Sequence, residues 1–234
     1  MRKRGTPDRQ TRAAVAACAF FLATPAQPQP LACPDSNVLV EGAGEDTGRI
    51  CAIVAATQRQ FDQCGGLTIP EDIEIAINPD LGLNCVGLYH CGEHRIELLP
   101  PDTYNNDTAM SATGEFSMIT PGAYFESVLR HELAHAAMDD LMECPLPNCL
   151  VGQEYVAYAL QIEFLPASDR DAFLATQPEV ARPISRDELH PMILFMAPGL
   201  FARKAWLHFR DRPDPCGFLG QVARGEVLLD YEHF

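Results

Sequence analysis

Residues 120–142 read TPGAYFESVLRHELAHAAMDDLM, and we expect the fold to be organised around this stretch. Thr120 is a suitable N-cap and Pro121 suits the first position of a helix. Most of the residues that follow are good helix formers. At 100° per residue, one stripe of this helix is apolar except for two histidines. Its members are Tyr124, Val128, His131, His135, Met138 and Met142.

The two histidines belong to the run HELAH at residues 131–135, which is an HExxH motif. Residues i and i+4 share one face of a helix, so His131 and His135 can bind one metal ion. Glu132 lies one step around the helix, where it can accept a proton from water at that ion. So short a pattern also arises by chance. The alternative is a pair of core histidines that bond to backbone groups or carboxylates.

A third ligand would favour the metal site, because catalytic zinc usually has three protein ligands and one open position. The metzincin pattern fails, since Met138 and Leu141 stand where it needs a glycine and a histidine. Glu154 is the better candidate. It lies near the start of a second helical run, residues 153–165, after a short connection. We expect His131, His135 and Glu154 to form the site.

With these residues the chain resembles the gluzincin metallopeptidases. The resemblance rests on HELAH and on Gln153-Glu154-Tyr155-Val156-Ala157, and it covers mostly residues 120–165. It implies that His131, His135 and Glu154 bind Zn²⁺ and that Glu132 is the general base. Two departures concern subfamily and substrate: Gln153 replaces a common Asn, and Tyr158 stands where some members have Asp. Substrate motifs of exopeptidases, such as Gly-x-Met-x-Asn, are absent from the sequence.

The resemblance also implies the fold class, an α+β zincin-like domain. Such a domain has a small antiparallel or mixed sheet, an active-site helix and a helical C-terminal part. In that fold an edge strand above the metal pairs with extended substrate. Residues 95–99 are the best candidate for this strand. Side chains that could support the ligands or bind the transition state are Tyr155, Tyr158, Asp139 and His190, and each of them has a purely structural alternative.

The remaining elements follow from periodicity and turn residues. We expect a helix over 45–63, a strand over 73–77 and a β-hairpin with legs at 86–90 and 94–99. Further helices are expected over 168–176, 200–210 and 218–231. Ser185 and Glu188 form a capping-box pattern.

Residues 1–26 are typical of a signal peptide, with cleavage near Ala26. Basic residues crowd residues 1–12, and Ala13–Leu22 is apolar but too short to span a bilayer. The expected protein is therefore secreted or periplasmic. Residues 27–234 suit a single domain, with the sheet and metal-binding helices in 27–165 and a helical subdomain in 166–234.

Cysteine content agrees with export. One of the nine cysteines, Cys18, lies in the signal segment. The other eight suggest disulfides: Cys33, Cys51, Cys64, Cys85, Cys91, Cys144, Cys149 and Cys216. Proximity favours Cys85 with Cys91 and Cys144 with Cys149. We expect Cys216 to tie the C-terminal region to the N-terminal half.

The formal net charge of −15 makes nucleic acid and anionic membranes unsuitable partners. No apolar stretch after the signal segment is long enough for a membrane span. The leading hypothesis is an exported zinc peptidase acting on a peptide or protein substrate. The alternatives are an exported zincin-like metal-binding protein without turnover, and a disulfide-stapled structural domain. The sequence carries no signal for an oligomeric state.

Overall fold

The computed structural model describes residues 29–34, 36–82, 85–104, 115–142, 149–176 and 182–230. The expected signal peptide, Cys18 and Cys144 lie outside these ranges. None of the helices within these ranges combines the length and the hydropathy that a membrane span requires.

Five strands form one mixed sheet in the order β1-β2-β3-β5-β4. The strands are β1 (Leu31–Ala32), β2 (Leu39–Glu41), β3 (Glu74–Ile77), β4 (Gly87–His90) and β5 (Arg95–Leu98). Strands β2, β3 and β5 run parallel, whereas β1 and β4 are antiparallel to their neighbours. The expected strand at 73–77 and the expected hairpin are confirmed to within one or two residues.

The position of the hairpin corrects one expectation. Strand β5 lies between β3 and β4, so residues 95–99 do not form an edge, and β4 is the edge strand instead. Both legs alternate in polarity, so the sequence did not show which leg would pair with β3. Ile96 and Leu98 are completely buried, whereas Leu88 on β4 is 40% exposed. The inward-facing residues of the interior strand β5 are therefore completely covered.

Seven α-helices accompany the sheet in the described residues. They are α1 (Thr47–Gln63), α2 (Pro121–Asp139), α3 (Leu150–Glu163), α4 (Ala167–Ala175), α5 (Pro191–Met196), α6 (Pro198–Arg210) and α7 (Pro215–Ala223). Short 3-10 turns are η1 (Gly44–Asp46), η2 (Pro101–Tyr104), η3 (Glu115–Met118) and η5 (Arg186–Glu188). The last expected helix begins and ends earlier than 218–231, and the capping box of Ser185 and Glu188 is confirmed.

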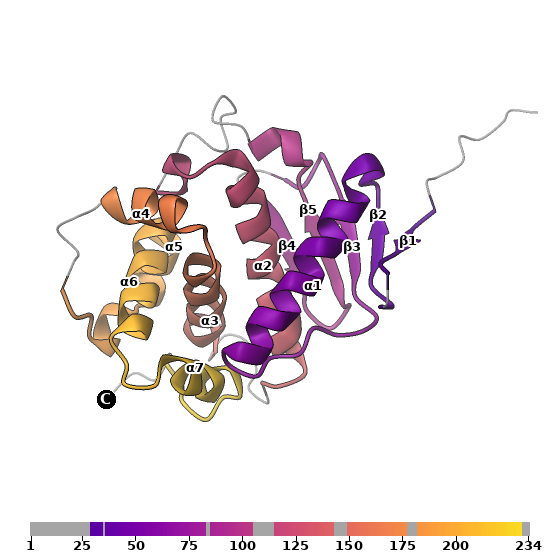
Figure 1. Ribbon diagram of the computed structural model, residues 1–234. Coiled ribbons are helices and arrows are strands. Elements are labelled where there is room, and N and C mark those ends of the chain that lie inside the picture. Colours follow the sequence, from indigo (N-terminus) through magenta and orange to yellow (C-terminus); the bar gives the residue numbers. More distant parts are fainter. Residues whose placement is uncertain are drawn as a thin grey trace, which may run out of the picture.

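Figure 1 shows how the helices are layered against the sheet. Helix α1 crosses one face of the sheet, α2 lies in the middle of the molecule, and α3 to α7 lie on the side away from the strands. The main core joins sheet residues such as Ile75 and Ile96 to Phe61 of α1 and Leu133 of α2, all of them fully buried. The α+β class with a mixed sheet is confirmed. Helix α2 is held between the sheet and α3, which places the HExxH run at the centre of the fold.

Disulfides fasten this arrangement at two described places. Cys33 pairs with Cys51 on α1, and Cys64 at the end of α1 pairs with Cys216 on α7. The second bond confirms that Cys216 ties the C-terminal region to the N-terminal half. Cys149 is also disulfide-bonded, but the pairing with Cys144 stays a prediction.

The expected bond between Cys85 and Cys91 is wrong, because both are free thiols. These residues lie at opposite ends of β4, and six residues of extended chain span about 20 Å. A disulfide requires Cα atoms roughly 4.4–6.8 Å apart. The hairpin therefore keeps the two thiols too far apart to react with each other.

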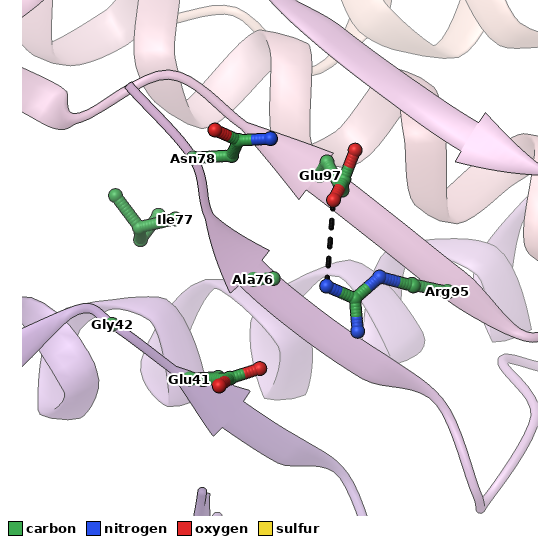
Figure 2. Close-up of a pocket in the computed structure, with 7 residues that line it drawn as sticks. All are labelled: Glu41, Gly42, Ala76, Ile77, Asn78, Arg95 and Glu97. Carbon is green, nitrogen blue, oxygen red and sulfur yellow. Dashed lines mark hydrogen bonds and ion pairs between the residues drawn. The ribbon is translucent and has the colours of Figure 1, made fainter. Parts of the chain in front are cut away.

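The other face of the sheet is polar. It carries a shallow pocket of about 250 Å³ that Figure 2 shows in close-up. There Arg95 pairs with Glu97 at 3.4 Å and also with Glu74, and His90 lies 3.2 Å from Glu97. The charged side chains at this pocket are thus largely paired with one another.

Candidate metal centre

Helix α2 supplies the first two ligand candidates. Thr120 is its N-cap, with Pro121 in the first turn as expected, and the Thr120 amide donates to Asp169 at 2.6 Å. The helix ends at Asp139, three residues before the expected end. His131 and His135 lie one turn apart in its buried half, as the HExxH spacing requires.

Helix α3 supplies the third candidate. It begins at Leu150 rather than at 153, and Gly152, Ala157 and Ala159 are small side chains that suit close packing. Helices α2 and α3 pack extensively against each other. Glu154, in the first half of α3, therefore reaches the two histidines of α2.

The three side chains converge on one point. Nε2 of His131 lies 3.1 Å from Nε2 of His135. Glu154 places Oε2 at 3.5 Å from His131 Nε2 and Oε1 at 3.7 Å from His135 Nε2. For ligands about 2.0–2.1 Å from a tetrahedral ion, donor atoms lie about 3.3 Å apart. The observed separations are close to this value, so His131, His135 and Glu154 could hold a metal ion.

Electrostatics in this cluster also suit a cation. Burial would raise the pKa of Glu154, but the two imidazoles outweigh burial and lower it. Burial likewise disfavours the charged form of His131, but Glu154 and Glu132 outweigh burial, so the pKa of His131 is raised. Burial lowers the pKa of His135 to about 4, despite the attraction of Glu154. An ionised Glu154 carboxylate beside a largely neutral His135 is a pair of donors that suits a cation.

Glu132 lies against the edge strand. A Cβ atom added to Gly87 of β4 would stand 2.8 Å from Oε1 of Glu132 and 2.7 Å from Val128. Burial raises the pKa of Glu132 to about 7, while His131 and the backbone amide of Tyr89 act in the opposite direction. Such a carboxylate can both accept and release a proton near neutral pH.

The remaining expected site residues separate into two groups. Tyr158 belongs at the cluster, because its ring centroid lies 4.4 Å from that of His131. Asp139 supports the hairpin instead, accepting hydrogen bonds from the Tyr89 hydroxyl at 2.8 Å and the Gly92 amide at 2.6 Å. Asp139 thereby joins the end of α2 to the hairpin turn.

Two expected candidates have other roles. Tyr155 is completely buried, with its hydroxyl 3.0 Å from Nδ1 of His208 on α6. It faces the C-terminal helices. His190 is exposed and is the N-cap of α5, where its Nδ1 accepts a hydrogen bond from Met192. These contacts give both residues structural roles.

Sequence reasoning assigned no role at the site to two residues that the structure places there. Gln161 lies 3.0 Å from Nδ1 of His131, and its position seven residues after Glu154 on the same helix face was an available signal. Gly87 carried no such signal, because it lies on a strand 45 residues before Glu132 in the chain.

Comparisons with known proteins give one family. Residues 38–232 match the model described as "Family of unknown function (DUF6639)". No curated protein and no solved structure matches the chain.

Proposed function

The chain belongs to this family of unknown function, and we propose that it is an exported, zinc-dependent peptidase. The observation that carries the proposal is the convergence of His131, His135 and Glu154 beside a buried carboxylate, Glu132. The resemblance of HELAH and residues 153–157 to gluzincin metallopeptidases supports the same reading, although the zincin fold itself is part of the proposal.

Zinc is the ion that we propose, because two imidazoles and one carboxylate are a common catalytic zinc ligand set. This set leaves one coordination position for water or substrate. The chemistry that zinc supplies when bound is polarisation of the scissile carbonyl and activation of water. The electrostatics of the site fit this choice, since the pKa of Glu154 is lowered and its carboxylate can balance part of the charge of the ion.

Glu132 is the proposed general base. Its carboxylate takes the proton of the attacking water and passes it to the leaving amine. A pKa of about 7 suits both transfers, because the group is neither strongly acidic nor permanently protonated. Tyr158 is the proposed donor to the oxygen of the tetrahedral intermediate, since burial keeps its hydroxyl protonated.

Strand β4 is the proposed binding edge for an extended peptide. The Leu99 amide donates to the Val86 carbonyl at 3.1 Å, and the register pairs Gly87 with Leu98 and Tyr89 with Ile96. In an antiparallel ladder every second residue turns its backbone groups outward, here Gly87 and Tyr89. The Gly87 carbonyl already accepts from the Cys85 thiol, and the Tyr89 amide already faces Glu132. We therefore propose that an added substrate strand pairs with the Gly87 amide and the Tyr89 carbonyl next to Glu132.

Export is proposed from the disulfides and from the signal-like residues 1–26. Structural disulfides persist in oxidising compartments and are rare in the cytosol. The bonds Cys33–Cys51 and Cys64–Cys216 are consistent with a secreted or periplasmic protein.

The test uses purified chain without residues 1–26. Metal analysis should find about one zinc per chain, and a peptide library should be cleaved. Glu132→Gln should keep the zinc and abolish cleavage. Glu126→Gln is a matched control on the same helix, where Glu126 pairs with Arg49 at 3.3 Å, and it should leave cleavage unchanged.

Two outcomes would overturn the proposal. Zinc binding without cleavage of any peptide by the wild-type chain would indicate a metal-binding protein without turnover. Absence of metal in the wild-type chain, with thermal stability unaffected by a chelator, would indicate a structural domain with core histidines.

A further inference from the structure

We propose that Gln161 is a positioning residue that decides which nitrogen of His131 faces the ligand cluster. The inference rests on the metal site of the proposed function. Oε1 of Gln161 lies 3.0 Å from Nδ1 of His131, and Nε2 of Gln161 lies 3.1 Å from Oγ of Ser127. Oγ of Ser127 lies 2.8 Å from the carbonyl oxygen of Tyr124. The side chains of Gln161 and Ser127 are almost completely buried, so these contacts hold in the absence of bulk water.

The chemistry of these groups gives the chain of hydrogen bonds a direction. A backbone carbonyl can only accept, so the Ser127 hydroxyl donates its proton to Tyr124. The Ser127 oxygen is then left as an acceptor and receives the Gln161 NH₂ group. The Gln161 carbonyl must therefore face His131, where it accepts from the Nδ1–H group.

This direction fixes the tautomer of His131. When Nδ1 carries the proton of a neutral imidazole, Nε2 carries the lone pair. Nε2 is the atom that lies 3.1 Å from Nε2 of His135 and 3.5 Å from Glu154. In the neutral ring the lone pair thus points into the ligand cluster, and in either protonation state the ring is held in the orientation that an ion requires.

The amide is suited to this position for an electrostatic reason. Glu132 and Glu154 already place two buried carboxylates near His131. A third carboxylate behind the ring would add like charge to the metal-free site, whereas a neutral amide accepts the same hydrogen bond without that charge. The carboxylate would, however, make His131 a more basic ligand.

The first test measures zinc affinity by competition with a chromophoric chelator at pH 8. Gln161→Leu removes the acceptor and should weaken zinc binding roughly 10–100-fold. Gln161→Glu restores an acceptor and should bind zinc at least as tightly as wild type, although the metal-free protein should be less stable. A structural role alone predicts that both variants lose affinity together.

Two further variants distinguish a specific effect on zinc binding from a general loss of folding. Ser127→Ala removes only the anchor of the amide and should weaken zinc binding less than Gln161→Leu does. Gln60→Leu is the matched control. Gln60 lies on α1, outside the ligand cluster, and its Oε1 accepts a hydrogen bond from Nε of Arg130 at 2.9 Å. It should leave zinc affinity unchanged. Equal zinc affinity of Gln161→Leu and wild type would overturn the proposal.

The second test reads the tautomer directly, in the metal-free chain at pH 8, by nitrogen-15 NMR of the imidazoles. His131 should be protonated at Nδ1 in wild type and lose this preference in Gln161→Leu. An Nε2-protonated His131 in wild type would contradict the hydrogen-bond direction. Because this measurement needs neither zinc nor cleavage, failure of the proposed peptidase activity and failure of the positioning role give different results.

Discussion

Gly87 and Glu132 are in such close contact that a single added methyl group would collide with the carboxylate. The Cβ position on Gly87 stands 2.8 Å from Oε1 of Glu132, closer than any ordinary carbon–oxygen contact. The contact joins the edge strand β4 to the motif helix α2. It explains how a strand remote in sequence can form one wall of the candidate site.

Substitution of Gly87 by alanine should therefore impair the site more than the fold. The added methyl group displaces Glu132 or β4, and such overpacking costs about 1–3 kcal/mol of folding free energy. We expect loss of most peptide cleavage with zinc retained. Urea unfolding, metal analysis and the cleavage assay measure the three effects.

Gly92→Ala in the hairpin turn is not a suitable control, because Gly92 has a positive φ of 75°. Gly48→Ala is a suitable control, since nothing lies near the Cβ position of Gly48. Full cleavage by Gly87→Ala would contradict the close contact.

Removal of the metal should destabilise the chain. A ligand that binds only the folded state at 100 times its Kd adds about 2.7 kcal/mol to the free energy of unfolding. Thermal unfolding with and without excess zinc should show this difference in wild type and lose it in Glu154→Ala. Zinc stabilisation that survives in Glu154→Ala would remove Glu154 from the ligand set.

Asp139 should contribute through the hairpin. Asp139→Asn weakens the acceptor that holds the Tyr89 hydroxyl and the Gly92 amide. A hydrogen bond to a charged group contributes about 1.5–3 kcal/mol. Urea unfolding should show that Asp139→Asn lowers the free energy of unfolding by an amount of this order, and that Tyr89→Phe lowers it by less. If the two losses are additive in the double variant, the residues are not coupled.

His208 should make the protein less stable in mild acid. Burial lowers its pKa from 6.5 to about 4, and the nearby Arg212 adds to the shift. Between these values the unfolded chain binds more protons than the folded chain, so stability falls as the pH falls from 6.5 towards 4. Between pH 7 and pH 5 the free energy of unfolding should fall in both proteins. We expect the fall in His208→Gln to be smaller than in wild type by about 1 kcal/mol, after allowance for solvent screening. Urea unfolding at the two pH values measures this, and identical pH slopes would contradict it.

The two cysteines that flank β4 should both react as free thiols, but at different rates because they differ in solvent exposure. Cys91 is exposed, whereas Cys85 is partly buried with its Sγ 2.9 Å from the carbonyl oxygen of Gly87. Iodoacetamide should therefore label Cys91 rapidly and Cys85 slowly in the native chain. Mass spectrometry of the digested protein locates the labels. A Cys85–Cys91 disulfide in that digest would restore the expectation from sequence.

The sequence predicted the local parts of the site because local rules apply to them. The spacing of His131 and His135 places both on one face of any α-helix, and Glu154 follows on the next helix. The expected pairing of Cys85 with Cys91 failed because nearness in sequence is not nearness in space when an extended strand lies between. The edge strand was assigned to the wrong leg of the hairpin, since both legs carry the same alternation.

The sequence by itself determined that two imidazoles share one face of a helix with a carboxylate one step around it, because 3.6 residues per turn place i and i+4 on the same side. Only the tertiary structure decided how closely Glu154 approaches the two histidines, that Gln161 contacts His131 and that Gly87 meets Glu132. These contacts join three separate elements, and their distances depend on how α2 packs between α3 and the sheet. That packing comes from the burial of many apolar side chains at once, which no short motif records.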